Sequence, residues 1–309
     1  MTRLTGRWPK FQAWRRRLRY GLPTVLGLCP QGYFIPYRYA GLAPPPGGRP
    51  SYAPIEALFE ASQGEFREWL GVLDGYRQML TAIGDLPAPA PRWQQDWFPR
   101  LDGAMAYTMT RALAPRRIVE IGSGHSTRFY ARAVADGGLN TVITAIDPAP
   151  RAALAGLDAV TLERRTLQQC GLEPFAGFEP GDILSIDSSH ILMPGSDVDL
   201  LLNHVLPMLP AGAIVHFHDI FLPDDYPAQW AWRGYGEQLG VAALLSGGAW
   251  RPLFASHYAI SRMAGTIADS IVASLPLVAG AHESSLWLEK EIVGLKKEKP
   301  DGSNMRCRD

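Results

Sequence analysis

The sequence predicts an α/β protein with a doubly wound, mostly parallel β-sheet, preceded by a helical and irregular extension. Two observations support this prediction. From Arg117 onward, short runs rich in β-branched residues alternate with stretches of helical spacing, which is the pattern of successive βαβ units. Before Arg117 the pattern differs, because the first 50 residues are rich in Arg, Pro and aromatic residues and end in a Pro/Gly cluster.

Length and composition set the general class of the protein. A chain of 309 residues is long enough for one large α/β domain plus a subdomain. Lys+Arg and Asp+Glu balance at 30 each, so the net charge gives no reason to expect a nucleic-acid partner. The three cysteines lack paired spacing and predict neither a disulfide framework nor a zinc cluster, which favours the reducing cytoplasm as the location.

The N-terminal 50 residues are expected to form an arm. No run of about 18 apolar residues is present, so no ordinary membrane span is predicted. Four arginines between residues 15 and 19 precede the apolar stretch 22–29, which raises a secretion signal as an alternative. Because Pro23 interrupts that stretch and no small-residue cleavage site closes it, an exposed basic arm with weak peripheral contact to anionic lipid is favoured.

The segment between the arm and Arg117 is expected to be helical. Apolar residues recur at helical spacing over 55–83, prolines at 87, 89 and 91 end the pattern, and the aromatic segment 92–102 is expected to dock against the next domain. Three regions follow: an arm and helical lid or subdomain over 1–102, a cofactor-binding domain over 103–265, and a C-terminal helix with a disordered tail over 266–309.

The cofactor-binding domain contains five candidate strands of the predicted sheet. They are the runs 117–121, 142–147, 159–163, 182–187 and 213–219. Helices are predicted over 126–136 and 197–209, and a later strand over 252–260, antiparallel at the sheet edge. In such sheets ligands bind beyond the carboxyl ends of the strands.

The first strand leads into a glycine turn. After Glu120, Gly122-Ser123-Gly124 forms a tight turn, and a helix opens at Ser126 or Thr127. Glycines let a ligand approach the backbone, and a helix start supplies free N–H donors, so a Rossmann-like cofactor site is expected. The turn alone is weak evidence, because dinucleotide-binding dehydrogenases use a similar one with a third glycine.

The second strand ends in Asp147, roughly two dozen residues downstream of the turn. An acid at this position binds the ribose hydroxyls of a nucleotide cofactor. The alternative is a local role, in which Asp147 caps the segment that begins at Pro148. After the third strand, residues 165–167 occupy the position expected to contact an adenine.

Five motifs together resemble a known family. EIGSGHSTR, AIDPAPR, GDILSIDSSH, GSDVD and HFHDIFLPDDYP are similar to the bacterial class I methyltransferases called methyltransferase family 24, and the resemblance extends from about residue 32 to about residue 258. It implies the class I methyltransferase fold, S-adenosylmethionine as cofactor, and methylation of a sugar or natural product. Under this resemblance, Glu120 before the turn and Ser126 in place of a third glycine favour S-adenosylmethionine over NAD.

The resemblance also implies site residues. The methionine and ribose side of the pocket falls on Glu120, Gly122, Ser123, Gly124, His125, Ser126 and Asp147, with Asp187 as a further cofactor contact. Related enzymes that use magnesium hold it with an acid after the fourth strand and an acid followed by Asn or Asp after the fifth. Here Asp219 is followed by Ile220, so the third ligand is missing; no metal site is predicted, and magnesium remains an alternative.

Two polar clusters end adjacent strands of the predicted sheet and supply candidates for the general base. His190 is the first choice, because imidazole titrates near neutral pH and a loop after a strand reaches a ligand; a purely local capping role is the alternative. His218 with Asp219 forms the second choice, while His216 is expected to be a buried structural histidine. Asp187 is left with three roles: metal ligand, acceptor contact or turn cap.

The leading interpretation is an enzyme that methylates a hydroxyl of a small-molecule acceptor. An NAD-linked oxidoreductase is disfavoured, because the third glycine is absent and no Tyr-x-x-x-Lys pair follows the fourth strand. A non-catalytic module that binds the cofactor is the third reading, and homo-oligomerisation stays open.

Overall fold

The computed structural model describes residues 14–15, 17–84 and 86–291, and the chain divides into two compact units. Unit 1 comprises residues 1–49 and 225–234, and unit 2 comprises residues 50–224 and 235–309. The two are considered separately. The C-terminal tail for which the sequence predicts disorder lies outside the described residues.

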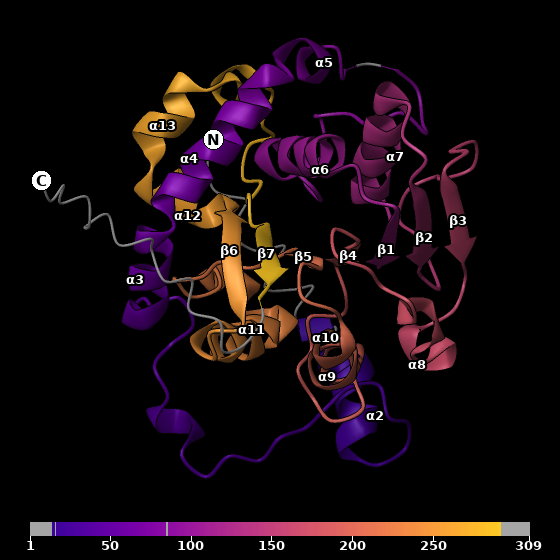
Figure 1. The fold of residues 1–309 in the computed structure, drawn as a ribbon. Coiled ribbons are helices and arrows are strands. Elements are labelled where there is room, and N and C mark those ends of the chain that lie inside the picture. Colours follow the sequence, from indigo (N-terminus) through magenta and orange to yellow (C-terminus); the bar gives the residue numbers. More distant parts are fainter. Residues whose placement is uncertain (1–13, 16, 85, 292–309) are drawn as a thin grey trace, which may run out of the picture. The chain divides into compact units, whose positions relative to one another are not determined.

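Unit 2 is built on a seven-stranded sheet of order β3-β2-β1-β4-β5-β7-β6, which confirms the predicted α/β class I methyltransferase fold (Figure 1). The strands are β1 (Arg117–Ile121), β2 (Val142–Ile146), β3 (Val160–Glu163), β4 (Ile183–Ile186), β5 (Ile214–Phe217), β6 (Trp250–Ala255) and β7 (Leu286–Lys290). Neighbours among β1 to β5 pair in parallel, whereas β7 is antiparallel to both β5 and β6. The order reverses at β1 and β4, so a ligand site is expected at their carboxyl ends.

The C-terminal part of the sheet corrects two expectations. The region 266–309 was expected to hold a helix and a tail, yet it contributes β7, which is inserted between β5 and β6. Hydrogen-bonded strands flank β7 on both sides, and its side chains Leu286, Trp287 and Leu288 are buried. The strand expected over 252–260 is real only in its first half: β6 ends at Ala255 and a helix begins at Ser256.

Helices pack around the sheet, and the sequence predicted some of them, over 55–83, 126–136 and 197–209. The helices of unit 2 are α3 (Ala53–Ala61), α4 (Gln63–Gly75), α5 (Arg77–Thr81), α6 (Arg100–Leu113), α7 (His125–Gly137), α8 (Leu167–Cys170), α9 (Asp197–Leu200), α10 (Leu206–Met208), α11 (Glu237–Ser246), α12 (Ser256–Arg262) and α13 (Ala264–Asp269), with single turns η3 (Glu173–Phe175), η4 (Leu201–Val205) and η6 (Ile271–Ser274). Figure 1 shows α6 and α7 side by side, and α6 also packs against α4. The helical pattern over 55–83 thus becomes three helices, α3 to α5.

The aromatic segment before α6 docks on unit 2, as the sequence predicted. The ring of Trp93 lies 5.0 Å from that of Phe129 on α7, and the ring of Phe98 lies 5.1 Å from that of His218. Asp102 follows in the first turn of α6, fully buried, and accepts hydrogen bonds from the backbone N–H groups of Ser284 and Ser285 at 2.9 and 3.0 Å. The segment therefore ties α6 to the chain just before β7.

The described residues of unit 1 form short turns of helix. They are η1 (Arg17–Gly21), α2 (Leu22–Val25), η2 (Ala40–Leu42) and η5 (Ala228–Arg233). Asp225 holds the end of the arm, because it accepts hydrogen bonds from the Gly47 N–H at 2.9 Å and from the Arg49 guanidinium. Within the described residues, no helix combines the length and apolar character needed to cross a membrane.

Candidate active site

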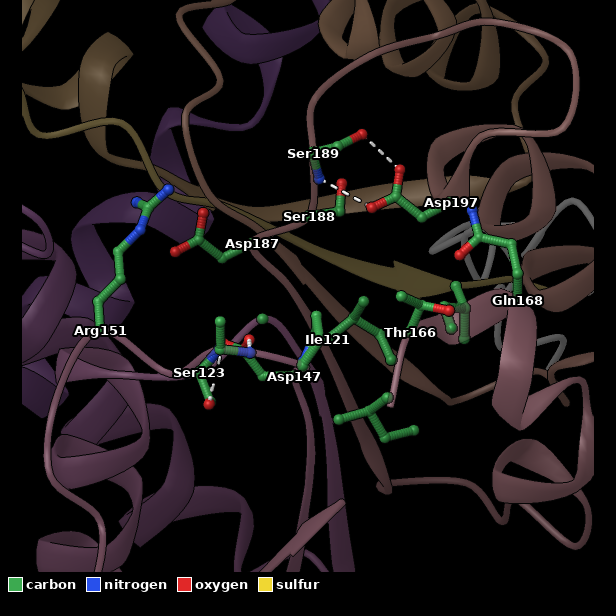
Figure 2. A pocket seen from close by; sticks show the side chains of 15 residues that line it. Ile121, Ser123, Asp147, Arg151, Thr166, Gln168, Asp187, Ser188, Ser189 and Asp197 are labelled. Atoms are coloured by element: carbon green, nitrogen blue, oxygen red, sulfur yellow. Dashed lines mark hydrogen bonds between the residues drawn. The ribbon is translucent and has the colours of Figure 1, made fainter. Parts of the chain in front are cut away.

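A cavity of about 270 Å³ opens at the carboxyl ends of the central strands. Figure 2 shows Ser123 and Asp147 on one side of it and Asp187 and Ser189 on the other. Thr166, Leu167 and Gln168 at the start of α8 line it as well, whereas Arg165, also expected at the adenine position, does not. The volume and the mix of apolar and carboxylate groups fit the nucleoside part of a cofactor.

Gly122 needs its glycine for a steric reason. Its φ is +78°, and a Cβ there would lie 2.0 Å from the backbone oxygen of Asp187. The Gly122 N–H donates to the Ile146 carbonyl at 3.0 Å, and the Asp187 N–H donates to the Ile121 carbonyl at 2.8 Å. The turn is thereby held between the ends of β2 and β4, with no room for a side chain.

Asp147 makes the local contacts of one expected role and lines the cavity where the other, ribose binding, is predicted. One carboxylate oxygen accepts hydrogen bonds from the Ser123 backbone N–H at 2.8 Å and from the Ser123 hydroxyl at 3.1 Å. The other oxygen accepts from the Ala149 N–H at 2.7 Å, which is the local capping contact. Asp147 thus fixes the glycine turn while its carboxylate lines the cavity.

Glu120 and Ser126, both expected at the cofactor, lie beneath the cavity instead of in its wall. Glu120 is fully buried and accepts hydrogen bonds of 2.5 Å from the hydroxyls of Ser126 and Thr127. Burial raises the pKa of Glu120 to about 8, against the lowering effect of those two hydroxyls. Glu120 therefore braces the first turn of α7 against β1.

Gly124 and His125, the other two residues of the expected pocket, are also absent from the cavity lining among the described residues. The Gly124 N–H donates to the Thr127 hydroxyl at 3.0 Å, which closes the first turn of α7. Burial, together with the positive charges of Arg128 and Arg92, lowers the pKa of His125 to about 4, so its imidazole is neutral. Gly124 and His125 therefore belong to the start of α7 and not to the cavity wall.

On the other side of the cavity, Asp187 is the group that meets the opening. Its side chain is 32% exposed, whereas that of His190 behind it is 5% exposed. The Nε2 atom of His190 lies 3.2 Å from Asp187 Oδ1. Burial alone would raise the pKa of Asp187, but His190 and His218 hold it well below 3.8. The structure thus places the first-choice base behind a carboxylate.

Glu237, in the first turn of α11, is a member of the site that the sequence did not predict. It is fully buried, and its Oε2 atom lies 2.8 Å from His190 Nδ1. Burial alone would lower the pKa of His190, but the Asp187 and Glu237 carboxylates raise it well above 6.5. The local sequence gives no sign of this pair, because 47 positions separate the two residues.

His218, the second-choice base, faces the same carboxylate. Its Nδ1 lies 3.6 Å from Asp187 Oδ1 and its Nε2 lies 3.4 Å from Asp102 Oδ2. Neither ring nitrogen has a hydrogen-bond partner among the described residues, so these contacts act through charge. Burial lowers the pKa of His218 and the surrounding carboxylates outweigh it, leaving the pKa well above 6.5. Asp102 is a second partner that the sequence did not reveal.

Two backbone conformations set this cluster apart. His190 and Asp219 have φ of +60° and +58°, and they are two of only three non-glycine residues with positive φ in the described chain. Such conformations cost about 1 to 3 kcal/mol and concentrate at functional sites. They bring His190 Nε2 within 3.6 Å of Asp219 Oδ2.

His216 is the buried structural histidine that the sequence predicted. Its Nδ1 lies 3.0 Å from the hydroxyls of both Tyr130 and Ser185, and its Nε2 lies 2.9 Å from the Ser285 hydroxyl. Burial lowers its pKa to about 3, so it is neutral and held within the sheet.

No group of three or more His, Cys, Asp or Glu side chains in the described part of the chain is arranged to hold a metal ion. Asp187 and Asp219, the two acids of the alternative magnesium set, both contact His190 and His218.

Comparison with known proteins supports the class that this topology indicates. Residues 119–220, about a third of the chain, match a family model described as a methyltransferase domain. This match spans the glycine turn, Asp147 and the Asp187–His190 loop. No curated protein matches the sequence.

Similar solved structures include three methyltransferases. The SAH-bound methyltransferase PaMTH1 of Podospora anserina is 15% identical, with 84% of this chain and 100% of that chain covered and a TM-score of 0.41. A putative O-methyltransferase of Klebsiella pneumoniae is 14% identical, with 72% and 90% covered and a TM-score of 0.41. TomG of Streptomyces achromogenes, an O-methyltransferase of tomaymycin synthesis solved with SAM, is 16% identical, with 72% and 90% covered and a TM-score of 0.39.

The sheet order and the family match together define the class. The chain contains a methyltransferase domain with the class I fold, and it is an enzyme of the methyltransferase class.

Proposed function

We propose that the protein transfers a methyl group from S-adenosylmethionine to a hydroxyl of a small polar acceptor, such as a sugar or a natural product. The observation that supports the proposal is a cavity lined by the Asp147 carboxylate on one side and by Asp187, which lies 3.2 Å from the His190 imidazole, on the other. The cysteine pattern favours the cytoplasm as its location.

The β1–β2 side supplies the cofactor contacts in this proposal. Asp147 binds the ribose hydroxyls, the Gly122–Ser123 backbone lies against the methionine part, and Leu167 packs on the adenine. When bound, the cofactor supplies an electrophilic methyl group on a sulfonium. The residues of the chain bind it and orient it toward the β4 loop, so that transfer becomes an in-line displacement between held groups.

The β4–β5 side handles the acceptor and its proton. The acceptor hydroxyl donates a hydrogen bond to Asp187, which accepts it as an ionised carboxylate because the two histidines lower its pKa. The proton passes from the hydroxyl through Asp187 Oδ1 to His190 Nε2, 3.2 Å away, when His190 is in its neutral form. Glu237 then stabilises the imidazolium through Nδ1.

Two binding measurements and one assay test the proposal. Calorimetry should give a micromolar Kd for S-adenosylmethionine and its demethylated product, and none for NAD. An assay for the demethylated product across sugar and phenol libraries should then identify an acceptor. Tighter binding of NAD would indicate the oxidoreductase alternative, and cofactor binding without turnover on any acceptor would indicate a binding module.

A further inference from the structure

The N-terminal arm, residues 1–50, belongs to the basic end of the chain. Nine of the 30 Lys and Arg residues lie within residues 1–55, and none of the 30 Asp and Glu residues does. The rest of the chain therefore has a net negative charge. The net charge of zero is thus the sum of a basic N-terminal region and an acidic remainder, and the basic region is suited to an anionic partner.

The arm also holds much of the exposed apolar surface. Of the 21 large apolar side chains that are exposed in the described residues, 12 lie in the arm, including Leu26 at 60%, Leu28 at 76% and Leu42 at 82% exposure. No described residue of the arm is buried. A segment without a core of its own gains little to offset the entropy of ordering, so a partner surface is needed to stabilise it.

A cavity within unit 1 combines both kinds of group. It measures about 290 Å³ and is lined by Arg17 together with Tyr20, Val25, Phe34 and Trp232, among others. A guanidinium beside aromatic and aliphatic walls matches a lipid, which has an anionic phosphate and an apolar chain in one molecule. A nucleic acid would satisfy the arginines but leave aliphatic side chains such as Leu22 and Leu26 without apolar contact.

We propose that the arm binds the surface of an anionic lipid bilayer. The arginines Arg17, Arg19 and Arg38 contact headgroup phosphates, and the aliphatic side chains of residues 18–28 insert among the acyl chains. The methyltransferase would then work beside a membrane. This role involves no residue of the cofactor cavity, so it stands or falls independently of the proposed methyl transfer.

The test is vesicle co-sedimentation of the full chain. Binding is measured on phosphatidylcholine vesicles with and without phosphatidylglycerol, at low salt and at about 0.5 M salt. The triple variant R17Q/R19Q/R38Q should lose about fivefold in affinity for each arginine, or about 100-fold in all. The matched control R67Q/R77Q/R164Q removes three exposed arginines of unit 2 and should bind vesicles like the wild type.

A second pair of variants separates lipid from other partners. L22S/L26S should weaken vesicle binding about tenfold or more. The control L172S/L239S, which replaces two exposed leucines of unit 2, should not weaken it. Equal binding to both vesicle types, or none, overturns the proposal. So does binding to single-stranded RNA that exceeds vesicle binding and is unaffected by L22S/L26S. A third outcome would also overturn the proposal. If the wild type does not bind vesicles but forms dimers in light scattering, and the arm variants abolish these dimers, the partner is a second copy of the chain.

Discussion

On the β1–β2 side of the cavity, carboxylates are paired with hydroxyl and backbone N–H groups, whereas on the β4–β5 side they are paired with imidazoles. Asp147 accepts hydrogen bonds from Ser123 and Ala149, none of which changes charge near neutral pH. Asp187 instead contacts His190 and His218, whose pKa values are both raised. Asp147 is thus held by uncharged donors, whereas Asp187 faces two imidazoles that can take up and release protons.

This difference fits a division of labour in methyl transfer. Binding a cofactor needs fixed acceptors, while activation of a hydroxyl needs a place for its proton. Clustered carboxylates push imidazole pKa values up and therefore postpone the neutral, proton-accepting form to higher pH. Mutations on the β1–β2 side should consequently lower affinity for the cofactor, and mutations on the β4–β5 side should lower turnover.

The largest expected effect is that of Asp187→Asn on turnover. The change keeps the shape but removes the negative charge that receives the acceptor hydroxyl, so kcat should fall about 1,000-fold, or about 4 kcal/mol. Steady-state kinetics with an identified acceptor measures it, and calorimetry should show cofactor Kd within about threefold of wild type. Asp199→Asn, at a partly exposed carboxylate in the first turn of α9, is the control and should change kcat less than twofold. A wild-type kcat for Asp187→Asn would show that Asp187 does not receive the hydroxyl of the methyl acceptor.

The sequence was a partial guide to both sides of the cavity, for a physical reason. Four of the residues expected on the β1–β2 side do not line the cavity: Glu120, Gly124, His125 and Ser126. Gly122, Ser123 and Asp147 work through the turn that contains them or the end of the neighbouring strand, so spacing reveals them. Glu237 and Asp102 reach the histidines from α11 and α6, and only tertiary packing brings them there. The same limit hid β7, whose strand character comes from the two strands that flank it.

His190→Ala should lower turnover about 100-fold or more while leaving cofactor affinity unchanged, because a positioned base contributes roughly that much. Turnover and calorimetry together measure the separation. His204→Ala, at an exposed histidine of η4, is the matched control and should retain wild-type kinetics. If His190→Ala keeps full activity and His218→Ala abolishes it, the proton goes to the end of β5 instead.

Asp147→Ala tests the opposite side. Loss of a charged acceptor for the ribose hydroxyls should weaken cofactor binding by about 1 to 3 kcal/mol, with kcat at saturation changed much less. Asp158→Ala, at an exposed acid on the loop after β2, serves as control. Because Asp147 also holds the Ser123 turn, circular dichroism and a melting curve must show a native fold for the affinity loss to count. Unchanged affinity in a folded variant would contradict the ribose assignment.

The smallest effect is a shift in pH dependence and concerns Glu237. If neutral His190 receives the proton, kcat should rise with pH and level off above the raised pKa of His190. Glu237→Gln removes one of the two carboxylates that raise this pKa, so the rising limb should move to lower pH by about one unit, which corresponds to about 1.4 kcal/mol. The plateau should fall less than tenfold, since the Gln oxygen still accepts from His190 Nδ1. Glu283→Gln, a buried carboxylate that pairs with Arg100 outside the cluster, controls for loss of a buried charge and should leave the limb in place. A Glu237→Gln profile that superimposes on the wild type would mean that His190 does not carry the proton, even if its loss lowers turnover.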